Sequence, residues 1–173
     1  EKNNLAKDIP FLLAFTPSVH TTSDAGNGIG YTGIRIRGSD ATRVNVTING
    51  IPYNDSESHG VFWVNMPDLA SSTNSIQIQR GVGSSTNGGG AFGGTVSIKT
   101  GNPSENFSLN YSSSAGSFST FKNSLDFNSG LIKNKLSLNL RLSKTNSDCY
   151  IDRAYSDLKS YYASASYYFD DST

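Results

Sequence analysis

Short alternations of apolar and polar residues, each closed by glycine or proline, recur between residues 34 and 100. A period of two residues is typical of a strand with one buried face. We therefore expect strands of one small sheet in these segments, which are 34–37, 44–49, 75–80 and 95–100.

Short helices and glycine-rich loops are expected around these strands. The mixed periodicity of 5–15 favours one or two helical turns that end before Pro17. Segment 67–70 favours a brief helix with proline in its first turn. The predicted loops are polar and rich in glycine, and they cover 21–33, 53–65 and 81–94. Gly101-Asn102-Pro103 closes this first unit, which we place at 1–102.

Longer alternations fill the second unit, placed at 103–173, and predict four antiparallel strands within 106–170. Their outstanding apolar face consists of Leu136, Leu138, Leu140 and Leu142. We expect a short turn at 128–134 and a long polar loop at 146–160. The segments match tilted membrane strands of roughly 9–11 residues with tyrosines at their ends. A soluble antiparallel sandwich gives the same alternation.

Two strand ends, Ile36-Arg37-Gly38 and Gln79-Arg80-Gly81, together with the glycine loop that follows, resemble the plug domain of TonB-dependent outer-membrane receptors. The resemblance implies an α+β plug domain, a small mixed sheet with short helices, followed by antiparallel strands of an outer-membrane β-barrel. It favours a barrel wall over a soluble sandwich.

Size predicts that the barrel is incomplete. A unit of about 100 residues has a radius of gyration of about 13 Å, too wide for an eight-stranded barrel, whereas plugged barrels have roughly 22 strands. Four strands cannot close such a barrel. We therefore expect a fragment that lacks most of a 22-stranded barrel and the N-terminal segment that engages TonB.

The resemblance implies an uptake receptor in the bacterial outer membrane, with the plug inside the barrel lumen. Such a receptor binds a scarce nutrient, namely a ferric siderophore, another iron chelate, cobalamin or an oligosaccharide. It imports this ligand to the periplasm when TonB displaces or remodels the plug. TonB, the small ligand and outer-membrane lipid are the expected partners. The alternative is a surface or soluble β-rich module that binds carbohydrate or acts as an adhesin.

Candidate ligand contacts lie in loops, because loops carried by a rigid sheet commonly bind ligands. We expect loops 23–33, 53–60 and 83–92 to emerge from the same end of the sheet. The glycines of the last loop are equally explained by tight turns. The candidate ligand-binding residues are Tyr53, Asn54, Ser58, His59, Asn87 and Phe92. The neighbouring Phe62 and Trp63 are assigned to the core or to wall contacts.

Arg37 and Arg80 each end a strand and precede glycine. A lone buried charge is costly, so each arginine needs a partner if it is buried. The resemblance implies that both pair with acidic residues of the barrel wall and so lock the plug. Exposed surface arginines are the alternative.

Several functions are disfavoured by composition and motif context. The 14 basic and 14 acidic side chains balance, which gives no reason to expect nucleic-acid binding. Glycine motifs at 28–33 and 88–93 lead into expected strands rather than helices, unlike dinucleotide sites. Alternating donors at 55, 57 and 59 could bind a divalent ion, but an exposed polar loop explains them equally. We expect no enzyme, cofactor or metal site.

Cys149 stands where receptors of this kind usually have glycine, in an Asp-Gly-Tyr motif. Cysteine adopts positive φ less readily than glycine. We therefore expect the loop around Cys149 to differ in shape from its counterparts.

Overall fold

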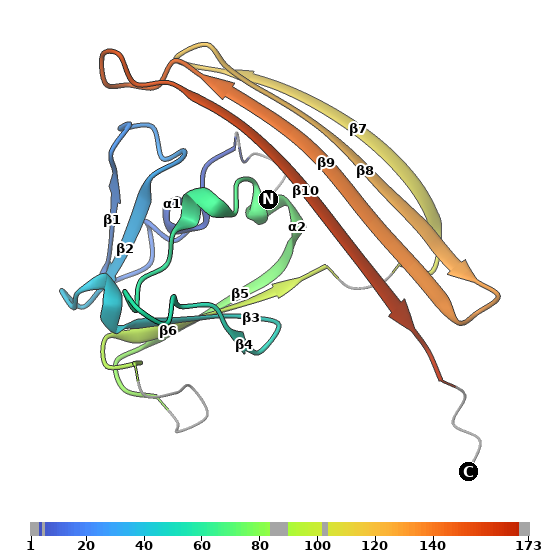
Figure 1. Cartoon of the computed structure of the whole chain (residues 1–173), viewed down its shortest axis with the longest axis horizontal. Helices are drawn as coiled ribbons and strands as arrows, with labels where there is room; N and C mark the ends of the chain where they lie inside the picture. The colour runs from blue at the N-terminus through green and yellow to red at the C-terminus, as the bar shows by residue number, and fades with distance from the viewer. Residues whose placement is uncertain (1–3, 5, 84–89, 102–103, 170–173) are drawn as a thin grey trace.

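The computed structural model describes residues 4, 6–83, 90–101 and 104–169. It contains an N-terminal unit, built from a four-stranded and a two-stranded sheet with short helices, and a curved four-stranded sheet that arches over it (Figure 1). We call this second sheet, formed by β7–β10, the wall. No helix in the described ranges is long and apolar enough to cross a membrane.

The four-stranded sheet of the N-terminal unit confirms three of the predicted strands, those at 44–49, 75–80 and 95–100. The fourth predicted strand, at 34–37, lies in β2 (Thr32–Ile36), which belongs to a separate two-stranded sheet with β1, so the expectation of a single sheet is corrected. The order of the four-stranded sheet is β4-β3-β6-β5, with β3 parallel to β6 and β5 antiparallel to β6. The strands are β3 (Val44–Ile48), β4 (Ile51–Pro52), β5 (Thr73–Arg80) and β6 (Gly94–Thr100). Alternate apolar residues of these strands are buried with Trp63, which confirms the assignment of Trp63 to the core. Phe62 is half exposed.

Short helices cover this sheet, as the sequence predicted. Helix α1 spans Ile9–Leu12, with proline in its first turn. Helix α2 spans Leu69–Ser72 with Asp68 as its N-cap, so the prediction for 67–70 is corrected, because Pro67 precedes the helix. Two single 3₁₀ turns, η1 (Ala41–Arg43) and η2 (Trp63–Asn65), sit at loop ends.

One strand was missed by sequence analysis. Segment 21–33 was predicted to be a loop, but β1 (Val19–Ser23) pairs antiparallel with β2 (Thr32–Ile36), and only 24–31 connects them. Val19 is the sole apolar residue of β1, so the strand shows no apolar alternation. Its backbone pairing with β2 holds it in place.

The wall confirms the four predicted antiparallel strands, in the order β10-β9-β8-β7. They are β7 (Phe107–Gly116), β8 (Thr120–Ile132), β9 (Leu136–Ser147) and β10 (Ser156–Tyr167). Leu140 and Leu142 are about half exposed on the outer face, whereas the alternate residues Arg141 and Ser143 are buried. Arg141 donates to the backbone carbonyl of Asp68 in the N-terminal unit. The predicted leucine face therefore points outward.

The turn predicted at 128–134 is corrected to 133–135, because β8 continues to Ile132. A bulge between Asn128 and Leu131 interrupts its alternation. Gly130 has φ of +67°, and a Cβ on it would lie 2.7 Å from the backbone nitrogen of Phe107. The glycine that resembles a turn signal in the sequence is therefore needed inside a strand.

Cys149 lies in the loop between β9 and β10 and has φ of +59°, in the left-handed region. Cysteine has therefore not prevented the conformation that glycine favours. Its thiol is buried, and the sulfur lies 3.3 Å from the hydroxyl oxygen of Ser156. A difference in loop shape from related receptors stays a prediction, as does the unit boundary at 102/103, which falls outside the described residues.

Candidate functional site

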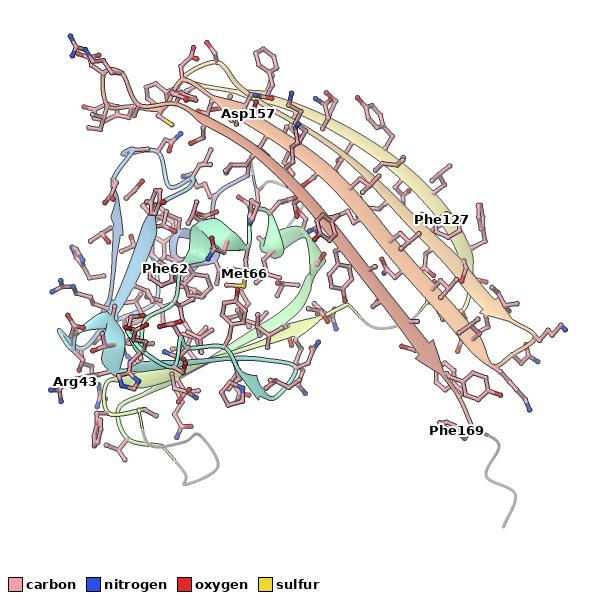
Figure 2. All side chains as sticks on the ribbon, viewed as in Figure 1. Arg43, Phe62, Met66, Phe127, Asp157 and Phe169 are labelled. Atoms are coloured by element: carbon pink, nitrogen blue, oxygen red, sulfur yellow. The ribbon has the colours of Figure 1, made fainter. Side chains whose placement is uncertain are left out.

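A cavity of about 570 Å³ opens at the end of the N-terminal unit away from the wall. It is formed where η1 and the start of β3 meet loop 53–62 and the end of the loop before β6, and Figure 2 shows Arg43 at this end. We call it the loop cavity. Its lining residues are Thr42, Arg43, Asn45, Asn54, His59, Gly90 and Phe92.

Parallel pairing of β3 with β6 explains why these segments meet. Val44 pairs with Gly94, the first residues of β3 and β6, so both strands begin at the same end of the sheet. The amide of Gly93 also donates to the carbonyl of Arg43 at 2.8 Å. The residues just before each strand are thereby held together.

Asn54 shapes the cavity from loop 53–62. Its Oδ1 accepts from the amide of Val46 at 2.7 Å, and its Nδ2 donates to the carbonyls of Val44 and His59, each at 2.9 Å. Both polar ends of the side chain are thus engaged by the backbone. Asn54, a predicted ligand contact, pins the loop to β3 in this structure.

The next residues form a self-contained turn. Asp55 Oδ1 accepts from the amides of Glu57 and Ser58 and from the Ser58 hydroxyl, at 3.1, 2.7 and 2.8 Å. These bonds, those from Ser58 first, hold the pKa of Asp55 below its ordinary value. Ser58 was predicted to contact ligand, but its hydroxyl is committed to this turn. The turn leaves His59 with φ of +57° at the cavity edge.

Hydrogen-bond donors dominate the polar lining. Arg43 is exposed at the end of η1, where the Asp40 side chain accepts from the amide of Thr42 at 3.0 Å. Asn45 is buried, and its Nδ2 has no hydrogen-bond partner among the described residues. Phe92 adds an aromatic face that is 61% exposed. The arrangement suits a ligand with acceptor oxygens beside an apolar or planar part.

The structure thus brings Asn54, His59 and Phe92 together, as predicted. Tyr53 is adjacent in sequence but does not line the loop cavity, and Asn87 lies outside the described residues. Sequence analysis missed Thr42, Arg43 and Asn45. Only the parallel register of β3 and β6 would have placed them here.

Contrary to expectation, loop 24–31 does not lie beside loops 53–62 and 81–93 at the loop cavity. It connects strands β1 and β2 of the separate hairpin and packs against the wall. The amide of Tyr150 donates to the carbonyl of Ala25 at 3.0 Å, and Asn27 Nδ2 donates to Ser147 Oγ at 3.0 Å. Loop 24–31 is therefore a contact between the N-terminal unit and the wall.

Buried charges form a second contact between the two units. Asp68, just before α2, pairs with Lys122 of β8 and lies beside Arg141 of β9. Lys122 Nζ also donates to Ser71 Oγ at 2.7 Å, and Arg141 Nη2 donates to the backbone carbonyl of Asp68 at 2.7 Å. All three charged side chains are at least 94% buried. We call Asp68, Ser71, Lys122 and Arg141 the charge cluster.

The predicted plug–wall arginines lie elsewhere. Arg37 and Arg80 are exposed in this chain. Arg80 Nη1 donates to the carbonyl of Pro17 at 3.2 Å, and the guanidinium of Arg37 lies against Gly81. In the charge cluster the signs of the charges are opposite to those expected. The acidic residue belongs to the N-terminal unit, and the basic residues belong to the wall. The role of Arg37 and Arg80 stays a prediction.

Asp8 is a buried carboxyl group between α1 and the β1–β2 hairpin. Thr32 Oγ1 donates to Asp8 Oδ2 at 2.9 Å. Burial raises the pKa of Asp8 from 3.8 to about 7, against the lowering effect of hydrogen bonds from Thr32 and Gly30, and the nearby Asp68 charge also raises it. In the described part of the chain, no three His, Cys, Asp or Glu side chains come close enough together to hold a metal ion.

Comparisons with known proteins identify a family and solved structures to which this chain is similar. Residues 1–95 match the model of the TonB-dependent receptor plug domain. A search of curated proteins found no significant match. Among solved structures, similar folds include FpvA of P. aeruginosa in complex with heterologous pyoverdines (TM-score 0.76, 17% identity, 92% of this chain and 21% of that chain).

Two further structures are similar to the same extent. They are the ferric-catecholate import receptor Fiu of E. coli K12 (TM-score 0.71, 20% identity, 95% and 22% of the two chains) and the copper transporter OprC (0.68, 19%, 93% and 26%). The chain spans about a fifth to a quarter of the length of these structures. A plug-like N-terminal unit covered by wall strands, and a family match over more than half of its residues, show that this chain belongs to the TonB-dependent receptor plug-domain family.

Proposed function

We propose that this chain is part of an outer-membrane receptor that binds a scarce nutrient and delivers it to the periplasm when TonB acts on the plug. It would have no catalytic chemistry of its own. The observation that carries the proposal is a plug whose loop cavity presents donors, held inside a wall with a polar inner and an apolar outer face.

The orientation of the wall supports this function. Barrels of the outer membrane have short periplasmic turns and longer external loops. In the wall, turn 133–135 is short and loop 148–155 is longer. In Figure 1 the elements of the loop cavity lie on the left, the side toward which loop 148–155 projects, and turn 133–135 lies on the right. The loop cavity would then face the outside.

The lining indicates a ligand class. Arg43, His59 and the free Nδ2 of Asn45 offer donors, and among the residues that the structure describes no acidic side chain lines the cavity. Oxygen-rich chelates with an aromatic or apolar portion fit such a lining, and Phe92 would pack against that portion. We infer a metal chelate, such as a ferric siderophore, as the ligand. The apolar outer wall face disfavours the alternative of a soluble carbohydrate-binding module.

Binding to the full-length receptor tests the proposal. The probes are ferric hydroxamate, ferric catecholate and ferric citrate chelates and cobalamin, titrated calorimetrically. Arg43→Ala should weaken binding of the recognised probe about 10- to 100-fold, because hydrogen bonds to a charged group are worth about 1.5–3 kcal/mol. Arg35→Ala, an exposed arginine outside the cavity, is the matched control.

His59→Ala should also weaken binding, whereas Asn54→Ala should chiefly loosen loop 53–62. Wild-type affinity in both Arg43→Ala and His59→Ala would assign recognition to outer loops of the barrel. No binding of any probe by a receptor correctly inserted in the membrane would contradict the inferred ligand class.

A further inference from the structure

The outer face of the wall carries a groove that plays no part in holding the plug. It has a volume of about 410 Å³. Leu125 and Leu142, which pair directly across β8 and β9, form its apolar floor. In the same cross-strand row, Tyr111 pairs with Leu125 and Tyr161 pairs with Leu142, so a tyrosine flanks the floor on each side. Both tyrosines are more than two-thirds exposed.

Positive charge lies at one end of this groove. Lys144 and Lys159 are direct cross-strand partners, one row beyond the leucines toward loop 148–155. Like charges facing each other across a sheet destabilise it unless they are compensated. Asp157 lies 4.0 Å from Lys144, and both side chains are about half exposed. Within the described ranges no acidic side chain pairs with Lys159.

The lysine pair Lys144 and Lys159 would therefore be stabilised by an anion from outside the chain. Two lysines against one aspartate leave a net positive charge beside an apolar floor. A small free anion would satisfy the lysines but not the floor, and an apolar chain would satisfy the floor but not the lysines. An amphiphile with an anionic head and an acyl chain satisfies both.

We propose that this groove binds an anionic lipid of the outer leaflet, whose phosphate lies between Lys144 and Lys159 and whose acyl chain covers Leu125 and Leu142. The inference rests on the proposed insertion of the wall in the outer membrane. The tyrosines lie at the edge of the apolar band, as aromatic side chains do at membrane interfaces. The lysines lie just beyond this edge, at the depth of lipid headgroups, and on the side of the longer loop 148–155.

Lipid retention by the full-length receptor tests the proposal. The receptor, purified in neutral detergent, is incubated with phosphorylated lipid A, and native mass spectrometry measures the lipid that remains bound. Lys144→Gln and Lys159→Gln should each reduce apparent affinity about fivefold, the effect of one basic residue at an anionic surface. Lys133→Gln, in the short turn at the opposite end of the wall, should leave it unchanged. Dephosphorylated lipid A should bind the wild-type receptor as weakly as lipid A binds the double variant K144Q/K159Q.

Any of the following outcomes would contradict the proposal. Equal retention of lipid A by wild type and double variant, with both receptors folded and inserted, would refute the groove and leave the proposed uptake function intact. Equal binding of phosphorylated and dephosphorylated lipid would reduce the groove to a generic apolar surface. Competition by inorganic phosphate alone, without displacement of the acyl chain, would assign the lysines to a free anion. A receptor that fails to insert in lipid vesicles would instead refute the function on which the inference rests.

Discussion

Neutralising Asp68 should loosen the plug from the wall, because Lys122 and Arg141 would be left buried with less opposing charge. Removing one member of a buried ion pair typically costs about 3–5 kcal/mol. Asp68→Asn is the sharpest change. Asp68 has φ of +58°, which asparagine tolerates, and its carbonyl would still accept the bond from Arg141. The substitution therefore isolates the charge.

The expected loss lies near the lower end of that range, at about 3 kcal/mol. Asp126 of β8 pairs in register with Arg141 of β9, so one negative charge remains beside this arginine. Lys122 keeps its bond to Ser71 but loses its ion pair. Lys122 should therefore account for most of the cost.

Hydrogen exchange in the full-length receptor measures this effect. A loss of about 3 kcal/mol should raise exchange of the amides of 69–72 about 100-fold. Asp157→Asn is the matched control, because it breaks the exposed Lys144–Asp157 pair, whose worth should not exceed about 1 kcal/mol. If Asp68→Asn raised exchange no more than the control did, the desolvation cost of the charge cluster would cancel its attraction. Packing alone would then hold the plug.

Three further predictions concern the lipid face, pH and plug retention. Leu140→Arg, on the outer face, should cost about 2–4 kcal/mol in refolding of the receptor into bilayers, and Asn139→Arg, on the inner face, much less; equal costs would contradict the orientation of the wall. Asp8 has a pKa of about 7 in the folded state and 3.8 as a free group, so the folded state binds more protons between these values. Stability should therefore fall as pH rises from about 4 to 7, by at most about 4 kcal/mol, and Asp8→Asn should abolish this slope in denaturant titrations. Arg37→Ala should lower the denaturant concentration that releases the plug without changing ligand affinity, and a change in affinity alone would remove the proposed locking role.

Strands with regular alternation could be predicted from sequence, because burial of one face imposes period two. Strand β1 could not be predicted in this way, because its backbone pairing with β2, rather than burial of apolar side chains, defines it. The bulge in β8 escaped it because Ser129-Gly130 breaks the alternation and has the composition of a turn. Local composition does not separate a turn from a bulge; the partner strand decides.

The candidate site was predictable only in part for a similar reason. His59 and Phe92 stood out as bulky side chains in polar loops, but Arg43 and Asn45 acquire their position from the register of β3 on β6. The charge cluster was hidden for another reason. Lys122 and Arg141 occupy polar positions of alternating strands, which indicates only an inward direction, and their partner Asp68 lies more than fifty residues away in sequence.

The two faces of the wall depend on a single register. On β9 the outward Leu140 and Leu142 flank the inward Arg141, so a slip of one residue would place the arginine in lipid and the leucines against the plug. The bulge preserves this sorting along β8. It shifts the alternation by one residue, so that Lys122 and Asp126 point inward before it while Ile132, opposite Leu136, points outward after it. The charge cluster and the apolar band therefore stabilise the same register from opposite sides of the sheet. A plug held by buried charge thus also helps to align the strands that surround it.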